Sequence, residues 1–99
     1  MDDNQDKLIA AIKAHAEDAE FKLLGYYVGK PQGGGLWSHY SKGRFDRTKG
    51  AELFDHEGDA QTAVESHAGS FYYPVYEKPS GTLYPTIPEI ALIFRDQVG

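Results

Sequence analysis

The sequence predicts an α+β fold, in which a small antiparallel sheet of about three to four strands packs against an N-terminal helix, a short central helix and a C-terminal helix. Three observations predict this class: apolar residues at helical spacing near the N-terminus, two aromatic-rich segments with the composition of strands, and glycine- and proline-rich turns between them. The 99 residues, 40% of them hydrophobic and 25% charged, have the length and composition of one globular domain, residues 1–99.

The first expected element is a helix from about Asp3 to Asp18. Asp3 is a suitable N-cap, and Asp6 lies in the first turn, where the helix dipole favours an acid. The apolar face of this helix has steps of three and four residues and is formed by Leu8, Ile9, Ile12, Ala16 and Ala19.

Two strands are expected next. Residues 21–29 are rich in aromatic and branched side chains, and residues 36–40 predict a second strand antiparallel to the first. Residues 30–35, with a proline and three consecutive glycines, are expected to form a flexible connection between them. Residues 41–50 are polar and basic, which indicates a loop or a second hairpin tip.

A second, short helix is expected after Leu53 and Phe54. Asp55 is a credible N-cap, and Gly69 is placed to end the helix in the left-handed conformation. The predicted buried stripe of this helix is formed by Ala60, Ala63, Val64 and His67.

The C-terminal part contains the strongest strand signal and one ambiguous element. Residues 70–77 (SFYYPVYE) predict a strand, but Pro74 has no N–H for the sheet, so this strand is expected at an edge or with a bulge. Thr86 and Glu89 have the spacing of a capping box, and the apolar residues that follow fit a helical face. The same short apolar run also fits a buried strand, and of the two we favour the helix.

Charge is distributed unevenly along the chain, which has a net charge of −5. Residues 21–49 carry six basic residues against Asp46, a net of +5, whereas residues 50–77 carry six acids and no Lys or Arg. Such a chain is expected to present one acidic and one basic surface, although solvated faces without a partner are often uneven as well.

Patterns that indicate catalysis or metal binding are missing from the sequence. There is no cysteine, the four histidines do not have the spacing of a helical zinc motif, and the triple glycine leads into strand-like residues rather than the Lys-Ser/Thr of a phosphate loop. We therefore expect no metal, no cofactor and no enzymatic activity, with a small enzyme kept as a third hypothesis.

The expected location is the cytoplasm of a bacterial cell. The N-terminus is acidic, unlike a signal peptide, and no apolar run is long enough to cross a membrane. The absence of cysteine also suits a reducing compartment.

Aromatic residues point to partner binding. The chain has seven tyrosines, and its strands place large groups on both faces of the sheet, so either the C-terminal segment covers the second face or that face meets a partner. We interpret it as a partner-binding face, which a second copy of the chain would also explain. The aromatic candidates are Tyr26, Tyr27, Trp37, Tyr40, Tyr72, Tyr73 and Tyr76. The acidic candidates are Glu52, Asp55, Glu57 and Asp59.

The segment from Trp37 to Val75 combines a hairpin, the sequence Ala-Glu-Leu-Phe-Asp at residues 51–55, a short alanine-rich helix and an aromatic strand. This arrangement resembles small orphan proteins of bacteriophages and mobile elements, including anti-CRISPR and other anti-defence inhibitors. The resemblance covers about forty residues. It implies a non-enzymatic inhibitor that docks on a bacterial nuclease or other defence protein or ribonucleoprotein complex, and it carries over no functional residue.

The alternative is a nucleic-acid-binding accessory protein. A basic stretch with aromatic residues interleaved could contact phosphates and stack on bases, and its cations are Lys42, Arg44, Arg47 and Lys49. The acidic character of the whole chain disfavours direct binding to nucleic acid, so we rank this hypothesis below partner binding.

Overall fold

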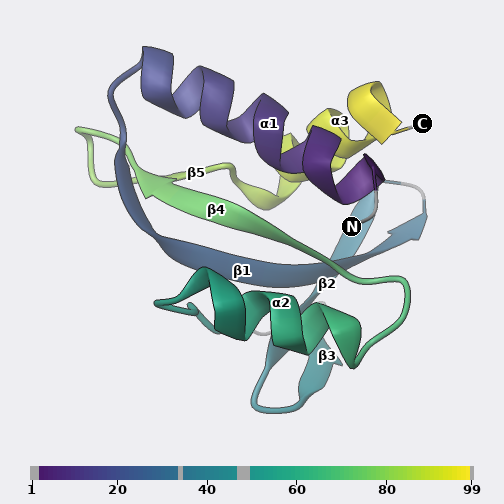
Figure 1. Ribbon diagram of the computed structural model, residues 1–99. Coiled ribbons are helices and arrows are strands. Elements are labelled where there is room, and N and C mark those ends of the chain that lie inside the picture. Colours follow the sequence, from purple (N-terminus) through teal and green to yellow (C-terminus); the bar gives the residue numbers. More distant parts are fainter. Residues whose placement is uncertain (1–2, 34, 47–49, 99) are drawn as a thin grey trace.

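The computed structural model describes residues 3–33, 35–46 and 50–98, in which three helices pack on the two faces of a five-stranded antiparallel sheet (Figure 1). The helices are α1 (Asp3–Asp18), α2 (Glu57–Glu65) and α3 (Ile87–Val98). The strands are β1 (Lys22–Gly33), β2 (Leu36–Ser41), β3 (Arg44–Asp46), β4 (Phe71–Glu77) and β5 (Leu83–Tyr84). The α+β prediction is confirmed, and the sheet exceeds the expected strand number because β3 and β5 are too short to produce a compositional signal.

The strand order is β3-β2-β1-β4-β5, with the long strand β1 at the centre. The expected antiparallel pairing of the first two strands is confirmed, with Gly29 opposite His39. However, residues 30–33 are not a separate connection, because Lys30 and Pro31 continue the ladder opposite β2. Backbone pairing with β2 overrides the weak strand propensity of this segment.

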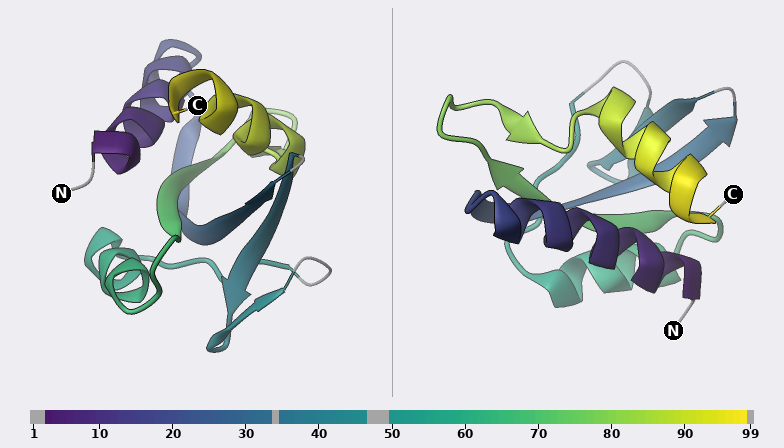
Figure 2. Two further views of the ribbon diagram at one scale, coloured as in Figure 1. Left: turned by 90° about the vertical axis from the view of Figure 1, so that its right-hand side faces the viewer. Right: turned by 90° about the horizontal axis from the view of Figure 1, so that it is seen from above.

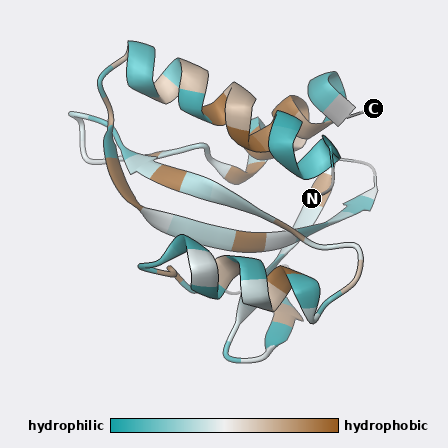
Figure 3. Cartoon of the chain, in the orientation of Figure 1, coloured by the Kyte–Doolittle hydropathy of each residue, from teal (hydrophilic) through white to brown (hydrophobic). Residues whose placement is uncertain are grey.

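The helices form two layers around the sheet: α1 and α3 cover one face and α2 covers the other (Figure 2). The larger core lies between the sheet and the α1–α3 layer, where hydrophobic segments of the two helices meet (Figure 3). Its buried members are Leu8, Ile12, Ala16, Trp37, Tyr73, Val75, Tyr76, Tyr84 and Ile90. A smaller core under α2 contains Val28, Ala60 and Tyr72. The C-terminal segment therefore covers the second face of the sheet.

The C-terminal segment is a helix, which we favoured over a buried strand, and its predicted capping box is formed. The Thr86 backbone N–H donates to the Glu89 carboxylate at 2.9 Å, and the Glu89 N–H donates to the Thr86 hydroxyl at 3.3 Å. This reciprocal pair satisfies backbone donors at the start of α3, which a strand would instead need a neighbour to satisfy.

The ends of the other two helices differ in detail from the predictions. Asp3, the expected N-cap of α1, is the first helical residue, and the residue before it lies outside the described part of the chain. The N-cap prediction for Asp55 was wrong by one residue, because α2 begins at Glu57 and His56 holds the N-cap position without a side-chain capping bond. Gly69 does adopt the left-handed conformation (φ 83°), in the turn that leads into β4.

Pro74 lies in β4 without costing a ladder bond. Its partner on β1 is Tyr26, whose N–H and C=O both bond to Phe54 on the side away from β4. On the other side of β4, the two-residue strand β5 pairs only with Tyr76 and Glu77. β4 is therefore not the edge strand that we expected, because it lies between β1 and β5, but the missing N–H of Pro74 falls where β4 has no strand on its β5 side.

Candidate functional site

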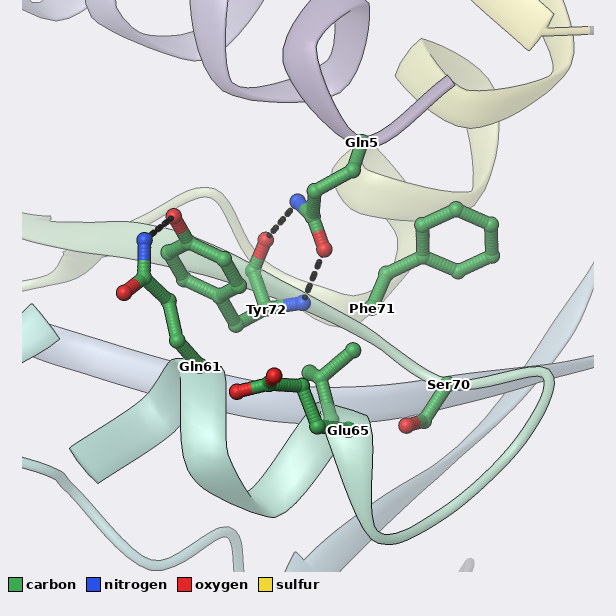
Figure 4. A pocket seen from close by; sticks show the side chains of 7 residues that line it. Gln5, Gln61, Glu65, Ser70, Phe71 and Tyr72 are labelled. Atoms are coloured by element: carbon green, nitrogen blue, oxygen red, sulfur yellow. Dashed lines mark hydrogen bonds between the residues drawn. The ribbon is translucent and has the colours of Figure 1, made fainter. Parts of the chain in front are cut away.

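A groove of about 480 Å³ opens between α1 and α2, beside the part of β4 that pairs with β1 but has no strand on its other side (Figure 4). Helix α1 contributes Gln5, helix α2 contributes one wall, and the start of β4 forms the floor. The lining residues are Gln5, Gln61, Val64, Glu65, Ser70, Phe71 and Tyr72.

The Gln5 side chain takes the place of a neighbouring strand. Its Nε2 donates to the Tyr72 carbonyl, and the Tyr72 N–H donates to its Oε1 at 2.9 Å (Figure 4). Gln5 is only 3% exposed, so these bonds satisfy backbone groups that are shielded from water. Gln5 thus closes the edge of β4 to another strand, and a ligand in the groove would meet side chains instead.

The Tyr72 hydroxyl ties α2 to the sheet. It donates to the Glu57 carboxylate at 2.9 Å and accepts from Gln61 Nε2 at 3.0 Å. Burial, assisted by the nearby Glu57 carboxylate, raises the pKa of Tyr72 to about 12. The hydroxyl therefore keeps its proton at neutral pH and acts as a structural donor.

The polar groups left over in the groove are mainly acceptors. The Ser70 hydroxyl proton is donated to the His67 carbonyl at 2.6 Å, and Gln61 uses its amide nitrogen on Tyr72. The Gln61 oxygen and the Glu65 carboxylate take part in none of these bonds (Figure 4). A groove with free acceptors and one negative charge suits a lysine or arginine side chain.

Beside the groove, residues 55–65 include three acids that we together call the acidic face: Asp55, which precedes the N-cap His56, and Asp59 and Glu65 of α2. All three side chains are exposed, and none has an ion-pair partner among the described residues. Asp59 lies in the first turn of α2, where the helix dipole also favours an acid. Sequence reasoning missed Glu65, although the run of acids without a basic residue in segment 50–77 was the signal that pointed to it.

The other two predicted acids accept hydrogen bonds from residues of the same chain. Glu57 is half-buried and accepts from Tyr72, and Glu52 accepts from the Lys42 backbone N–H at 2.9 Å. Of the four acids predicted from the sequence, Asp55 and Asp59 thus remain free to meet a partner.

Part of the aromatic set that we predicted to contact a partner is buried in the structure. Four of its members are between 1% and 5% exposed and belong to the two cores: Trp37, Tyr72, Tyr73 and Tyr76. They cannot contact a partner in this conformation. Tyr26, Tyr27 and Tyr40 are half-buried and keep some accessible surface.

The basic stretch is only partly described. Lys42 and Arg44 are exposed on the β2–β3 hairpin, whereas Arg47 and Lys49 lie outside the described residues. The interleaved rings do not stand free, because Tyr40 and Phe45 pack against the His67 ring with centroid distances of 5.2 and 5.3 Å. These rings contribute to packing at the end of α2 rather than to a stacking platform for bases.

Two other kinds of feature are missing from the described residues. No group of three or more His, Asp or Glu side chains there is arranged to hold a metal ion. None of the helices in the same residues is both long enough and apolar enough to cross a membrane.

Comparisons with protein-family models, with curated proteins and with solved structures find no match for this chain. The class that its own residues define is a small three-layer α+β domain with an acidic helix beside a groove lined by both apolar and polar side chains.

Proposed function

We propose that this chain is a non-enzymatic protein-binding module that docks through the acidic face, on and just before α2, on a basic surface of its partner. The proposal rests on one observation: three exposed acids, Asp55, Asp59 and Glu65, lie within residues 55–65 and have no ion-pair partner among the described residues. Arrays of like charge speed association with an oppositely charged partner and disfavour partners of the wrong charge.

The groove beside this face supports the proposal. Glu65 belongs to both, so a basic side chain seated in the groove would contact the same carboxylate that attracts the partner from a distance. Docking of this kind combines long-range steering with one buried anchor from the partner.

More specifically, we propose that the partner is a bacterial nucleic-acid-handling complex, such as a defence nuclease, and that this chain inhibits it. A cationic channel that normally holds nucleic acid is a surface to which an acidic helix is complementary. This form follows from the resemblance to inhibitors of phages and mobile elements.

The test is a pull-down from nuclease-treated bacterial lysate with the tagged chain, at low and moderate salt. One variant reverses the acidic face (Asp55→Lys, Asp59→Lys, Glu65→Lys). The matched control reverses three exposed acids at the end of α1 (Glu17→Lys, Asp18→Lys, Glu20→Lys), which changes the net charge equally.

We expect a stoichiometric protein partner that the wild type and the control retain, that the acidic-face variant loses by at least about tenfold, and that dissociates as salt rises. Equal retention by both variants would contradict the proposal. Recovery of a second copy alone would favour the homodimer. A mobility shift with DNA or RNA that disappears in Lys42→Ala/Arg44→Ala would favour the nucleic-acid-binding alternative.

A further inference from the structure

The α2 wall of the groove carries two hydrogen-bond acceptors at helical spacing. Gln61 and Glu65 both line the groove and are four residues apart on α2. Side chains at this spacing share one helix face, with their Cβ atoms about 5–6 Å apart. The Gln61 amide oxygen and the Glu65 carboxylate, which we call the acceptor pair, are therefore within reach of one ligand group.

A chain of hydrogen bonds sets the orientation of the Gln61 amide. The Tyr72 hydroxyl donates its one proton to the Glu57 carboxylate at 2.9 Å, so it can only accept from a second partner. Gln61 Nε2 donates to it at 3.0 Å, which turns the amide oxygen away from Tyr72 (Figure 4). The Gln61 oxygen is thus held as an acceptor before any ligand binds.

The rest of the groove offers apolar surface. Val64 on α2 and Phe71 at the start of β4 both line it and are half-buried. The Phe71 ring packs edge-on against Phe94, with centroids 5.0 Å apart. Figure 4 shows this ring on the far side of the groove from the Glu65 carboxylate. A ligand that spans the groove therefore needs a charged end for the acceptor pair and an apolar stem for the remainder.

We propose that the groove is a subsite for an arginine side chain of the partner, with its guanidinium on the acceptor pair and its stem over Val64 towards Phe71. The inference rests on the proposed function, because it identifies the basic anchor that docking would seat in the groove. The planar guanidinium carries five donors in a fixed fork and can meet both acceptors at once, whereas the lysine ammonium is a point charge. The methylene stem of arginine can be buried along apolar surface while its head stays hydrogen-bonded.

The test is a titration of the intact protein with N-acetyl-arginine amide, followed by NMR of the Gln61 side-chain amide and the backbone amides of residues 61–72. The citrulline analogue is a neutral isostere of this probe, and the lysine analogue keeps the charge without the fork. Glu65→Gln removes the carboxylate charge from the groove. Asp59→Asn is the matched control, because it removes the same charge from an exposed residue of α2 that is not part of the lining.

We expect the arginine probe to shift the Gln61 side-chain resonances saturably and to bind at least about threefold more tightly than the lysine analogue. The citrulline analogue should cause no saturable shift. Glu65→Gln should bind the arginine probe about three- to fivefold more weakly, and Asp59→Asn should stay close to the wild type. Unperturbed Gln61 resonances, or equal binding to the two variants, would overturn the subsite. Equal binding of the lysine or the citrulline analogue would overturn the assignment to arginine.

This result is separable from that of the pull-down. If the acidic-face variant loses its partner while the arginine probe does not bind, docking stands and the arginine subsite is overturned. If the probe binds while both charge-reversal variants retain the partner equally, the groove is a guanidinium site, and its assignment to the docking partner is overturned.

Discussion

Gln5 shows how a single side chain determines what one edge of the sheet can do. Its amide makes both hydrogen bonds that a neighbouring strand would make to Tyr72, two residues before Pro74, which has no N–H to offer. The N-terminal half of β4 is therefore protected from pairing with another chain by a side-chain amide and a proline together.

Replacing Gln5 tests this role. Gln5→Ala leaves the N–H and C=O of Tyr72 without partners, and we expect a loss of about 2–6 kcal/mol in the free energy of unfolding, because each buried polar group left unsatisfied costs about 1–3 kcal/mol. Urea denaturation measures the loss, and light scattering reports any self-association through the opened edge. Gln97→Ala, on the exposed side of α3, is the control and should change stability by less than about 0.5 kcal/mol. A similarly small effect of Gln5→Ala would contradict the role.

Among the elements, helix α3 determines which aromatic side chains are buried. By covering the sheet together with α1, it places Trp37, Tyr73 and Tyr76 in the larger core and leaves the acidic face and the groove as the candidate contact surfaces. The formation of α3 depends on its own N-terminus, where Thr86 and Glu89 form the capping box.

Removing the cap should weaken this layer. Thr86→Ala deletes the hydroxyl that accepts from the Glu89 N–H, and we expect a loss of about 1 kcal/mol in the free energy of unfolding, as for other N-cap residues. Thermal or chemical denaturation measures it. Thr86→Ser keeps the hydroxyl and should remain close to the wild type, whereas equal destabilisation by both substitutions would point to lost methyl packing instead of lost capping.

For the whole molecule, the buried His39 makes stability depend on pH. In the folded chain burial lowers its pKa to about 4, whereas in the unfolded chain it titrates near the ordinary value of 6.5. Between these values the unfolded state binds the extra proton, so stability is complete above pH 6.5 and falls as the pH drops towards 4. The loss reaches at most about 3 kcal/mol, at 1.36 kcal/mol for each pKa unit.

This dependence is measured by urea denaturation between pH 4 and pH 7. His39→Gln removes the titrating group, so its stability should change less over this range than that of the wild type. His56→Gln, at an exposed histidine before α2, is the control and should keep the wild-type profile. Identical profiles for the wild type and His39→Gln would show that His39 does not cause the effect.

Local patterns in the sequence were sufficient for most of the elements. The spacing of apolar residues defined α1, the capping-box spacing of Thr86 and Glu89 favoured α3, and aromatic composition located β4. These signals act between residues a few positions apart, so they do not depend on how the rest of the chain folds. The acidic character of segment 50–77 was equally readable, because charge is a property of composition.

Only the tertiary structure determined which side chains are accessible to a partner. Tyrosine fits both a core and a contact surface, so the burial of Tyr72 and Tyr73 depended on which helix covers each face of the sheet. The Gln5–Tyr72 and His39–Tyr73 pairs join residues 67 and 34 positions apart, and no local pattern marks such partners. The sequence thus determined the elements and their charge, while long-range packing determined the groove and the accessible surface.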